Sequence, residues 1–311
     1  MRNQTDEKEY RISRFDRGVM LLPYHLRERA RMLCKYDRMQ AEEFRFRLGQ
    51  PMSVLFPEGE RFLEGESITK EDLSGLMDIV TQGSKHTVGD SMRQGYITVR
   101  GGYRLGLCGT GIVQEGKITG LRSVSSVCLR IPKEIRGLTD ELLGRLSPKG
   151  EFTSTLILSP PGGGKTTLLR DMIRTFSNGD PKRGLGGLRF GVSDERGEIS
   201  GMWDGVPQMD LGIRTDILDG CPKDEGLLML LRGMNPQVIA LDEITAERDI
   251  DAMEKALHCG VKLLATAHAE RAEDLKSRGL YRRLLDSGVF HKCVVIRKEN
   301  ARRVYEVEEL I

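Results

Sequence analysis

The spacing of apolar residues takes two forms in this chain, and the change falls near residue 150. Beyond it, short runs of consecutive apolar residues alternate with segments in which apolar residues recur every three or four positions. Continuous runs are typical of strands buried on both faces, and the longer spacing is typical of amphipathic helices. The alternation predicts right-handed crossovers and a mostly parallel sheet. The expected strands are 155–159, 188–195, 236–243 and 262–268, and the expected helices are 166–176, 224–234, 248–260 and 272–288.

The first 131 residues follow a different pattern. A helix is expected after Pro23, and the alternation over 42–56 predicts a strand region with a break in it. Thr69 precedes a helical pattern that runs towards Gly83, so it is the expected N-cap. Four or so short strands separated by glycine turns are expected over 95–131. Together these elements predict an α+β domain.

The chain therefore divides into an N-terminal α+β domain over 1–131, a linker with one short helix over 132–152, and an α/β domain over 153–311. A length of 311 residues suits this division. The last strand-like segment, 291–310, is expected to fold as a hairpin on the sheet edge, turning around Glu299 and Asn300.

The composition of the chain mainly argues against certain partners and sites. The chain has 48 Lys and Arg against 46 Asp and Glu, a formal net charge of +2, which gives no global reason to expect nucleic acid or an acidic membrane as a partner. Its six cysteines show no CxxC pair and no zinc-ligand spacing, so reduced thiols in a cytosolic protein are expected. No segment resembles a signal peptide or approaches about 20 apolar residues. We expect a cytoplasmic protein that meets membranes through partners.

One segment between a predicted strand and a predicted helix carries a phosphate-binding pattern. "SPPGGGKT", residues 159–166, matches G-x-x-x-x-G-K-[ST] except that Ser159 replaces the first glycine. Backbone N–H groups there can surround a phosphate, Lys165 can reach the β- and γ-phosphates, and the Thr166 hydroxyl can bind Mg²⁺. The alternative is a glycine-rich turn that binds nothing, and the correctly placed Lys-Thr pair argues against it. The expected cofactors are ATP and Mg²⁺, and the expected binding residues are Pro161, Gly162, Gly163, Gly164, Lys165, Thr166 and Thr167.

Acidic residues follow the expected strand over 236–243. Asp242 and Glu243 come after an apolar run, and ligands of an open α/β sheet gather at the carboxyl ends of its strands. Asp242 is therefore expected to hold the Mg²⁺ hydration shell, and Glu243 to orient and partly deprotonate the attacking water. A pair of solvated acids before a helix is the alternative interpretation.

Two further strand ends carry polar residues. "LLATAHA" ends a buried strand at Thr266 and His268, and this position favours His268 as a sensor of the γ-phosphate over a merely hydrogen-bonded polar residue. "GVSDERGEISG" places Asp194 and Glu195 at another strand end, where the acids could support the metal or the water. Surface charge is the competing interpretation of this second pair.

These motifs carry a family resemblance. "SPPGGGKTTLLRD", "DERGEISG", "ALDEI" and "ATAHA" make the chain similar to the RecA-like ATPases of type II and type IV secretion systems and pilus motors. More narrowly, it resembles a family of stage III sporulation proteins of endospore-forming bacteria, over most of its length. The resemblance implies a RecA-like P-loop ATPase core, a homo-hexamer, and an N-terminal domain that packs on a neighbour's site. It also implies a location in the mother cell, with membrane proteins of the channel to the forespore as partners.

The resemblance also implies residue roles. Gly164, Lys165 and Thr166 match the phosphate loop, while the acidic box, the second Walker motif and the histidine box match Asp194 with Glu195, Asp242 with Glu243, and His268. The expected catalytic residues are Lys165, Glu195, Glu243 and His268, and the expected metal ligands are Thr166 and Asp242. Pilus motors often carry glycine where this chain has Asp242, so its metal role rests on broader P-loop chemistry. Candidate arginines acting across an interface are Arg104, Arg122, Arg214 and Arg232.

Three functions are compatible with these features. The favoured one is an ATP-hydrolysing motor that energises assembly of, or transport through, a channel. A nucleotide-gated scaffold with negligible hydrolysis is the second, although Glu243 argues against it because binding alone needs no water-orienting carboxylate. A nucleic-acid-binding ATPase is the third, since "GLCG" at 106–109 resembles the GxxG loop of KH domains. That tetrapeptide lacks basic residues, and the near-neutral charge does not support it.

Overall fold

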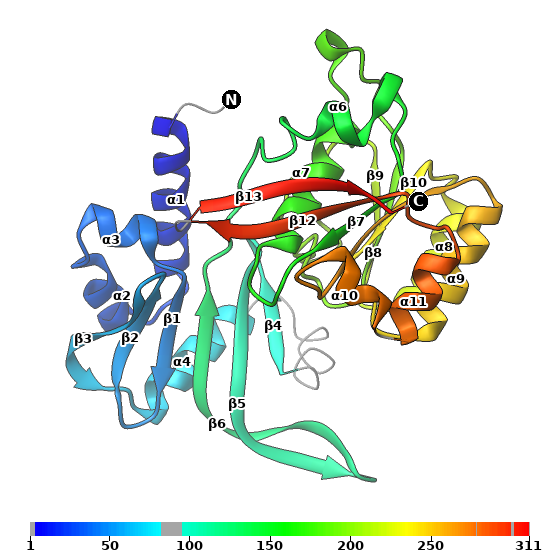
Figure 1. The fold of residues 1–311 in the computed structure, drawn as a ribbon. Coiled ribbons are helices and arrows are strands. Elements are labelled where there is room, and N and C mark those ends of the chain that lie inside the picture. Colours follow the sequence, from blue (N-terminus) through cyan, green and yellow to red (C-terminus); the bar gives the residue numbers. More distant parts are fainter. Residues whose placement is uncertain (1–3, 82–94, 278, 300–301, 311) are drawn as a thin grey trace. The chain divides into compact units, whose positions relative to one another are not determined.

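The computed structural model describes residues 4–81, 95–277, 279–299 and 302–310 (Figure 1). The chain forms two compact units. Unit 1 comprises residues 1–133 together with 201–208, and unit 2 comprises 134–200 together with 209–311. The segment 201–208 therefore belongs to unit 1, although the residues before and after it belong to unit 2.

Unit 1 is built on an antiparallel sheet with the strand order β3-β2-β1-β6-β5-β4. Its buried core includes Phe15, Phe44, Phe46 and Tyr103. Its strands are β1 (Glu43–Arg47), β2 (Pro51–Phe56), β3 (Gly59–Ser67), β4 (Tyr96–Val99), β5 (Tyr103–Gln114) and β6 (Lys117–Arg130). Its helices within the described residues are α1 (Gln4–Val19), α2 (Tyr24–Arg31), α3 (Lys35–Gln40) and α4 (Lys70–Thr81).

The expected cap of α4 is confirmed. Thr69 Oγ1 accepts a hydrogen bond from the Asp72 backbone N–H at 3.1 Å, and the Asp72 carboxylate accepts one from the Thr69 N–H at 2.9 Å. This reciprocal pair satisfies two backbone donors at the helix start. Gly83, the expected end of the pattern, lies outside the described residues.

One expectation for unit 1 is wrong, and the disfavoured interpretation of "GLCG" as a KH loop fails as well. The region 95–131 forms three strands because β5 and β6 are long and pair along most of their length, through three register shifts. The tetrapeptide "GLCG" at 106–109 lies inside β5, so it is not the loop that a KH domain requires. A Cβ at Gly109 would lie 1.8 Å from the Ser123 carbonyl oxygen, and this close strand approach explains the glycine.

Unit 2 contains the predicted mostly parallel sheet, in the order β13-β12-β7-β11-β10-β8-β9. All neighbouring pairs are parallel except β12 with β13, which form the expected edge hairpin. The edge strand β9 was not expected, since "TDILD" is short and mostly polar. The strands are β7 (Thr155–Leu158), β8 (Phe190–Asp194), β9 (Thr215–Asp219), β10 (Val238–Leu241), β11 (Lys262–Ala267), β12 (Lys292–Glu299) and β13 (Arg302–Glu309).

Helices cover both faces of this sheet (Figure 1). Residues such as Leu156, Ile239 and Leu263 pack in one core with α9 and α11, and alternate residues such as Ile157 and Leu264 pack in a second core with α7. The larger helices are α7 (Lys165–Asn178), α8 (Lys223–Gly233), α9 (Glu247–His258), α10 (Ala272–Lys276) and α11 (Gly279–Asp286). Short elements are α6 (Leu143–Leu146), η1 (Pro148–Gly150) and η2 (Pro181–Arg183).

The single helix expected over 272–288 is instead two helices, α10 and α11. The central parallel strands β7, β11, β10 and β8 all end at the same edge of the sheet, which therefore collects the residues that follow them. None of the described helices is both long and apolar enough to span a bilayer.

Candidate functional site

The loop over residues 159–164, predicted to bind phosphate and called the phosphate loop below, joins β7 to α7. Gly162 and Gly164 have φ angles of +72° and +103°, which favour glycine. A Cβ at Gly163 would lie 2.2 Å from Ser159 Oγ, so a side chain there would clash within the loop. Ser159, which replaces the usual glycine, is fully buried with its hydroxyl 2.9 Å from the Pro160 carbonyl oxygen. The loop therefore has the close backbone turns that a phosphate cradle requires.

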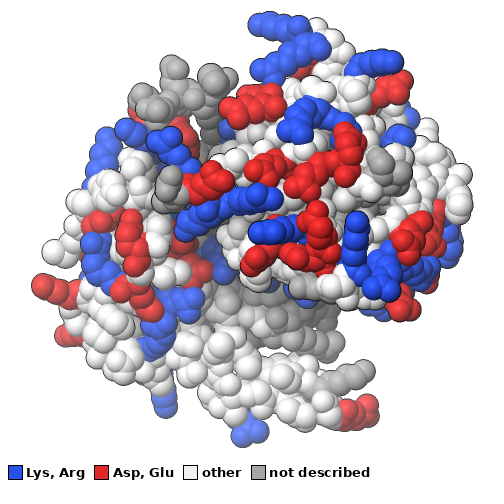
Figure 2. All heavy atoms as spheres, viewed as in Figure 1, with Lys and Arg blue, Asp and Glu red and all other residues white. Residues whose placement is uncertain are grey.

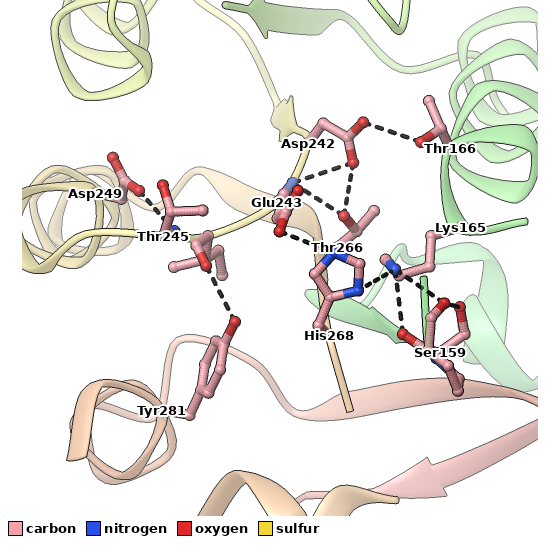
Figure 3. Close-up of polar contacts among 12 residues, drawn as sticks. Ser159, Lys165, Thr166, Asp242, Glu243, Thr245, Asp249, Thr266, His268 and Tyr281 are labelled. Atoms are coloured by element: carbon pink, nitrogen blue, oxygen red, sulfur yellow. Dashed lines mark hydrogen bonds and ion pairs between the residues drawn. The ribbon is translucent and has the colours of Figure 1, made fainter. Parts of the chain in front are cut away.

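Lys165 is the first residue of α7 and points along the edge where β10 and β11 end (Figure 3). Its ammonium lies 3.1 Å from the Ser159 carbonyl oxygen and 2.8 Å from His268 Nδ1. Burial lowers the pKa of Lys165, and the nearby carboxylates of Asp242 and Glu243 oppose that shift. A bound phosphate would supply a stronger acceptor for this partly desolvated cation.

Thr166 and Asp242 lie together, although they are 76 positions apart in the chain. The Thr166 hydroxyl donates to Asp242 Oδ2 at 3.0 Å, and the Thr266 hydroxyl donates to Oδ1 at 2.6 Å. One hydroxyl and one carboxylate at the mouth of a phosphate loop are the oxygen ligands that Mg²⁺ prefers. The residues present therefore fit a Mg²⁺ ion.

Glu243 occupies a strained turn just after β10. Its φ is +31°, uncommon for a residue with a side chain. The backbone N–H donates to Thr266 Oγ1 at 2.9 Å, and the carboxylate lies 2.8 Å from His268 Nε2 (Figure 3). A strained backbone conformation of this kind persists only where neighbouring contacts enforce it. Here the contacts with Thr266 and His268 hold the Glu243 side chain at the sheet edge.

The segment after Glu243 is anchored by contacts of its own (Figure 3). The Asp249 carboxylate accepts hydrogen bonds from the N–H groups of Thr245 and Ala246 at 3.0 Å each, and the Tyr281 hydroxyl donates to the Ile244 carbonyl at 3.1 Å. These contacts fix the start of α9 and hence the backbone on the far side of Glu243.

Lys223 is a site residue that the sequence reasoning missed. Its buried ammonium donates to the Glu243 carbonyl oxygen at 2.5 Å and to Thr245 Oγ1 at 3.3 Å, and it lies 3.5 Å from the Glu195 carboxylate. Lys223 is the first residue of α8, where the helix dipole disfavours a cation. A lysine at a predicted helix start is the signal that could have singled it out.

The two acids after β8 have different surroundings. Asp194 is buried and accepts hydrogen bonds from the backbone N–H groups of Glu198, Ile199 and Ser200 and from the Ser200 hydroxyl. Burial raises the pKa of Asp194 despite these hydrogen bonds, and its oxygens stabilise the turn that follows β8. Glu195 lines the same cavity as Lys223, Asp242 and Glu243, among other residues. Both acids line this cavity, but the Asp194 carboxylate is taken up by the turn that follows β8, whereas the Glu195 carboxylate lies 3.5 Å from the Lys223 ammonium.

The two candidate arginines of unit 2 lie away from the candidate site. Arg214 donates to the carbonyl oxygens of Ser177 and Asn178, at the opposite end of α7 from the phosphate loop. Arg232 lies on α8 and lines an open groove. In unit 1, Arg104 stacks on the Tyr96 ring with 3.6 Å from Cζ to the ring centroid, and Arg122 is exposed on β6.

Comparison with solved structures identifies the fold. The DotB ATPase of Yersinia pseudotuberculosis aligns with a TM-score of 0.60 and 14% identity, over 93% of this chain and 80% of that one. The pilus retraction motor PilT, solved with bound ADP, aligns with a TM-score of 0.57 and 20% identity, over 86% and 79%. At these identities the likeness speaks to the fold, and the chain has the RecA-like fold of secretion ATPases with an added N-terminal domain.

The sequence places the chain more closely. Residues 19–307 match the family "Sporulation stage III, protein AA", and the chain belongs to that family. It is 36% identical over 272 residues to Stage III sporulation protein AA of Bacillus subtilis (strain 168), covering 88% of this chain and 87% of that protein. The resemblance inferred from the strand-end motifs is thus confirmed.

Proposed function

We propose that this protein binds ATP at the phosphate loop and hydrolyses it with Mg²⁺. The observation that carries the proposal is the convergence of Lys165, Thr166, Asp242, Glu243 and His268 on one edge of the unit 2 sheet. Lys165 and Thr166 follow the phosphate loop, Asp242 and Glu243 follow β10, and His268 follows β11. Structural packing alone gives no reason for such a set of charged and polar groups.

The residues divide the chemistry among them. Lys165 neutralises charge on the β- and γ-phosphates, and Thr166 and Asp242 would hold Mg²⁺, which supplies charge neutralisation between the same phosphates. Glu243 orients a water molecule and accepts its proton as the water attacks the γ-phosphorus. Glu195 and Lys223 line the cavity beside Glu243 and hold its surroundings in place.

His268 links the phosphate side to the water side. Its ring contacts Lys165 through Nδ1 and Glu243 through Nε2, each at 2.8 Å. When a γ-phosphate becomes the acceptor for the Lys165 ammonium, the hydrogen bond from Lys165 to His268 Nδ1 is lost. The His268 ring can then move and change its hydrogen bond to Glu243. This exchange gives a chemical basis for the expected sensor role.

We also propose that the protein works as a homo-hexameric motor in the cytoplasm of the mother cell, with membrane proteins of the sporulation channel as partners. Membership of the sporulation family and the fold shared with DotB and PilT support this. Nucleic acid is not favoured as a partner. Figure 2 shows Lys and Arg interspersed with Asp and Glu over the viewed face of unit 2, without the single-sign surface that non-specific nucleic-acid binding uses.

Calorimetry with Mg-ATP tests the binding step. The wild-type chain is expected to bind, and Lys165→Ala is expected to lose most of its affinity while keeping its melting temperature without nucleotide. Lys255→Ala, at an exposed position of α9, is the matched control and should bind normally. Wild-type affinity in a folded Lys165→Ala protein would overturn the phosphate-loop assignment. Purification from sporulating cells with bound partners tests the channel assignment separately, and recovery of nucleic acid in place of membrane proteins would contradict it.

A further inference from the structure

The hairpin of β12 and β13 extends beyond the end of β7. β12 pairs with β7 only as far as Val295 opposite Leu158, yet it continues to Glu299 and stays paired with β13 up to Arg302. β7 turns into the phosphate loop directly after Leu158. The last residue pairs of the hairpin therefore lie beside that loop and have no strand partner on that side.

One hairpin side chain lies against the phosphate loop. A Cβ at Gly164 would come within 3.0 Å of Arg303 Nε and 3.2 Å of Arg303 Cζ, so the guanidinium group rests on this glycine. Gly164 is the N-cap of α7, the end of the helix that favours anions. A cation from a distant part of the sequence thus adjoins the expected phosphate site.

The strand register explains this placement. Arg303 pairs with Lys298, and side chains two residues apart on a strand share a face. Ile296 and Tyr305 are the next residues on that face, and they belong to the core that contains α7. Arg303 and Lys298 therefore continue the α7-facing side of the hairpin towards the N-terminus of that helix.

The charge of Arg303 is not paired with an acidic group among the residues that the structure describes. Within the described ranges, neither its guanidinium nor the Lys298 ammonium makes a hydrogen bond or an ion pair. Arg297, on the opposite face of the hairpin, instead pairs with Glu306 at 3.1 Å and Glu308 at 3.8 Å. Acidic residues thus neutralise Arg297 on one face of the hairpin. On the other face, the described residues supply no such partner for Arg303 and Lys298, so both cations can bind a phosphate.

The geometry points to Arg303 as a further nucleotide-binding residue, supplied by the same chain and directed to the α- and β-phosphates. This inference rests on the proposed function. The sheet order places β12 on one side of β7, and β11 and β10, which carry His268 and Glu243 at their ends, on the other. Arg303 therefore approaches the loop from the side opposite the hydrolytic residues. A guanidinium fork suits adjacent phosphate oxygens, and Lys298 adds positive charge beside it.

The test compares nucleotide affinities of full-length proteins by calorimetry. Arg303→Ala should weaken both Mg-ATP and Mg-ADP about tenfold or more, as expected for loss of a charged hydrogen bond, and should change kcat less than about twofold. Arg303→Lys should lie between Arg303→Ala and the wild type, because it keeps the charge and loses the fork. Arg302→Ala is the matched control, since this neighbour lies on the opposite face of β13 and should bind both nucleotides normally.

Three other results would each overturn a specific assignment. Wild-type affinity of Arg303→Ala for both nucleotides overturns this inference and leaves the proposed function standing. Loss of ATP affinity alone, with ADP unaffected, overturns the assignment to the α- and β-phosphates. A wild-type protein that binds neither nucleotide removes the proposed function and this inference together. If Arg303→Ala fails to fold, Arg303→Gln, which keeps most of the side-chain length, is measured in its place against the same expectations.

Discussion

The Lys165 ammonium lies 2.8 Å from Nδ1 of His268. An ammonium group can only donate, so Nδ1 accepts this hydrogen bond and the ring proton is on Nε2. That Nε2–H donates to the Glu243 carboxylate, 2.8 Å away. One imidazole ring therefore connects the residue proposed to bind phosphate to the residue proposed to act on water.

Removing this connection should affect hydrolysis more than binding. We expect His268→Ala to bind Mg-ATP within about threefold of the wild type while its kcat falls about tenfold or more, because Glu243 loses its positioning partner. Steady-state kinetics together with calorimetry measure the two effects. His258→Ala, at the end of α9, is the control and should behave as the wild type. An unchanged kcat in a folded His268→Ala protein would remove His268 from the mechanism.

Lys223 contacts the backbone of Glu243 through a hydrogen bond from its ammonium to the Glu243 carbonyl oxygen. We expect Lys223→Met, which keeps the length of the side chain, to lower kcat about tenfold with a smaller change in KM, since the carbonyl contact positions the catalytic carboxylate. Lys255→Met controls for loss of a lysine elsewhere in unit 2. A raised KM with normal kcat would instead make Lys223 a binding residue.

The main features of the candidate site could be predicted because its polar residues directly follow strands. The apolar runs locate the strands, and the residues directly after them, Asp242, Glu243 and His268, follow from the parallel topology. The glycines and Lys165 show the phosphate loop by themselves, since the backbone geometry they permit is local.

Other features depend on contacts between distant segments. Lys223 reaches Glu243 across 20 positions, and Arg303 reaches Gly164 through the register of a hairpin, so neither contact leaves a local pattern. β9 was missed because an edge strand needs little apolar sequence. The likeness of "GLCG" to a KH loop is incidental, because the tetrapeptide lies in a strand and Gly109 serves a close strand contact within unit 1.

Assembly provides a further test of the motor proposal. A phosphate loop at an open sheet edge leaves one side of the γ-phosphate for a neighbouring subunit to cover, and the unit 2 candidates Arg214 and Arg232 lie elsewhere in that unit. We expect Mg-ATP to promote hexamers of Glu243→Gln, measured by light scattering after size-exclusion chromatography. ADP should promote them less, because it lacks the γ-phosphate. A monomer at tens of micromolar protein that hydrolyses ATP at full rate would contradict the shared-site proposal.

The most direct test of the account is hydrolysis by Glu243→Gln, measured as phosphate release in a single turnover after Mg-ATP binding has been confirmed by calorimetry. The substitution keeps the shape and hydrogen bonds of the side chain and removes its basicity, so binding should persist while the rate falls by about two orders of magnitude or more. Glu195→Gln serves as the comparison, because Glu195 lines the same cavity. An unchanged rate in Glu243→Gln would contradict the assignment of the base, and a rate lost only in Glu195→Gln would move the role to Glu195.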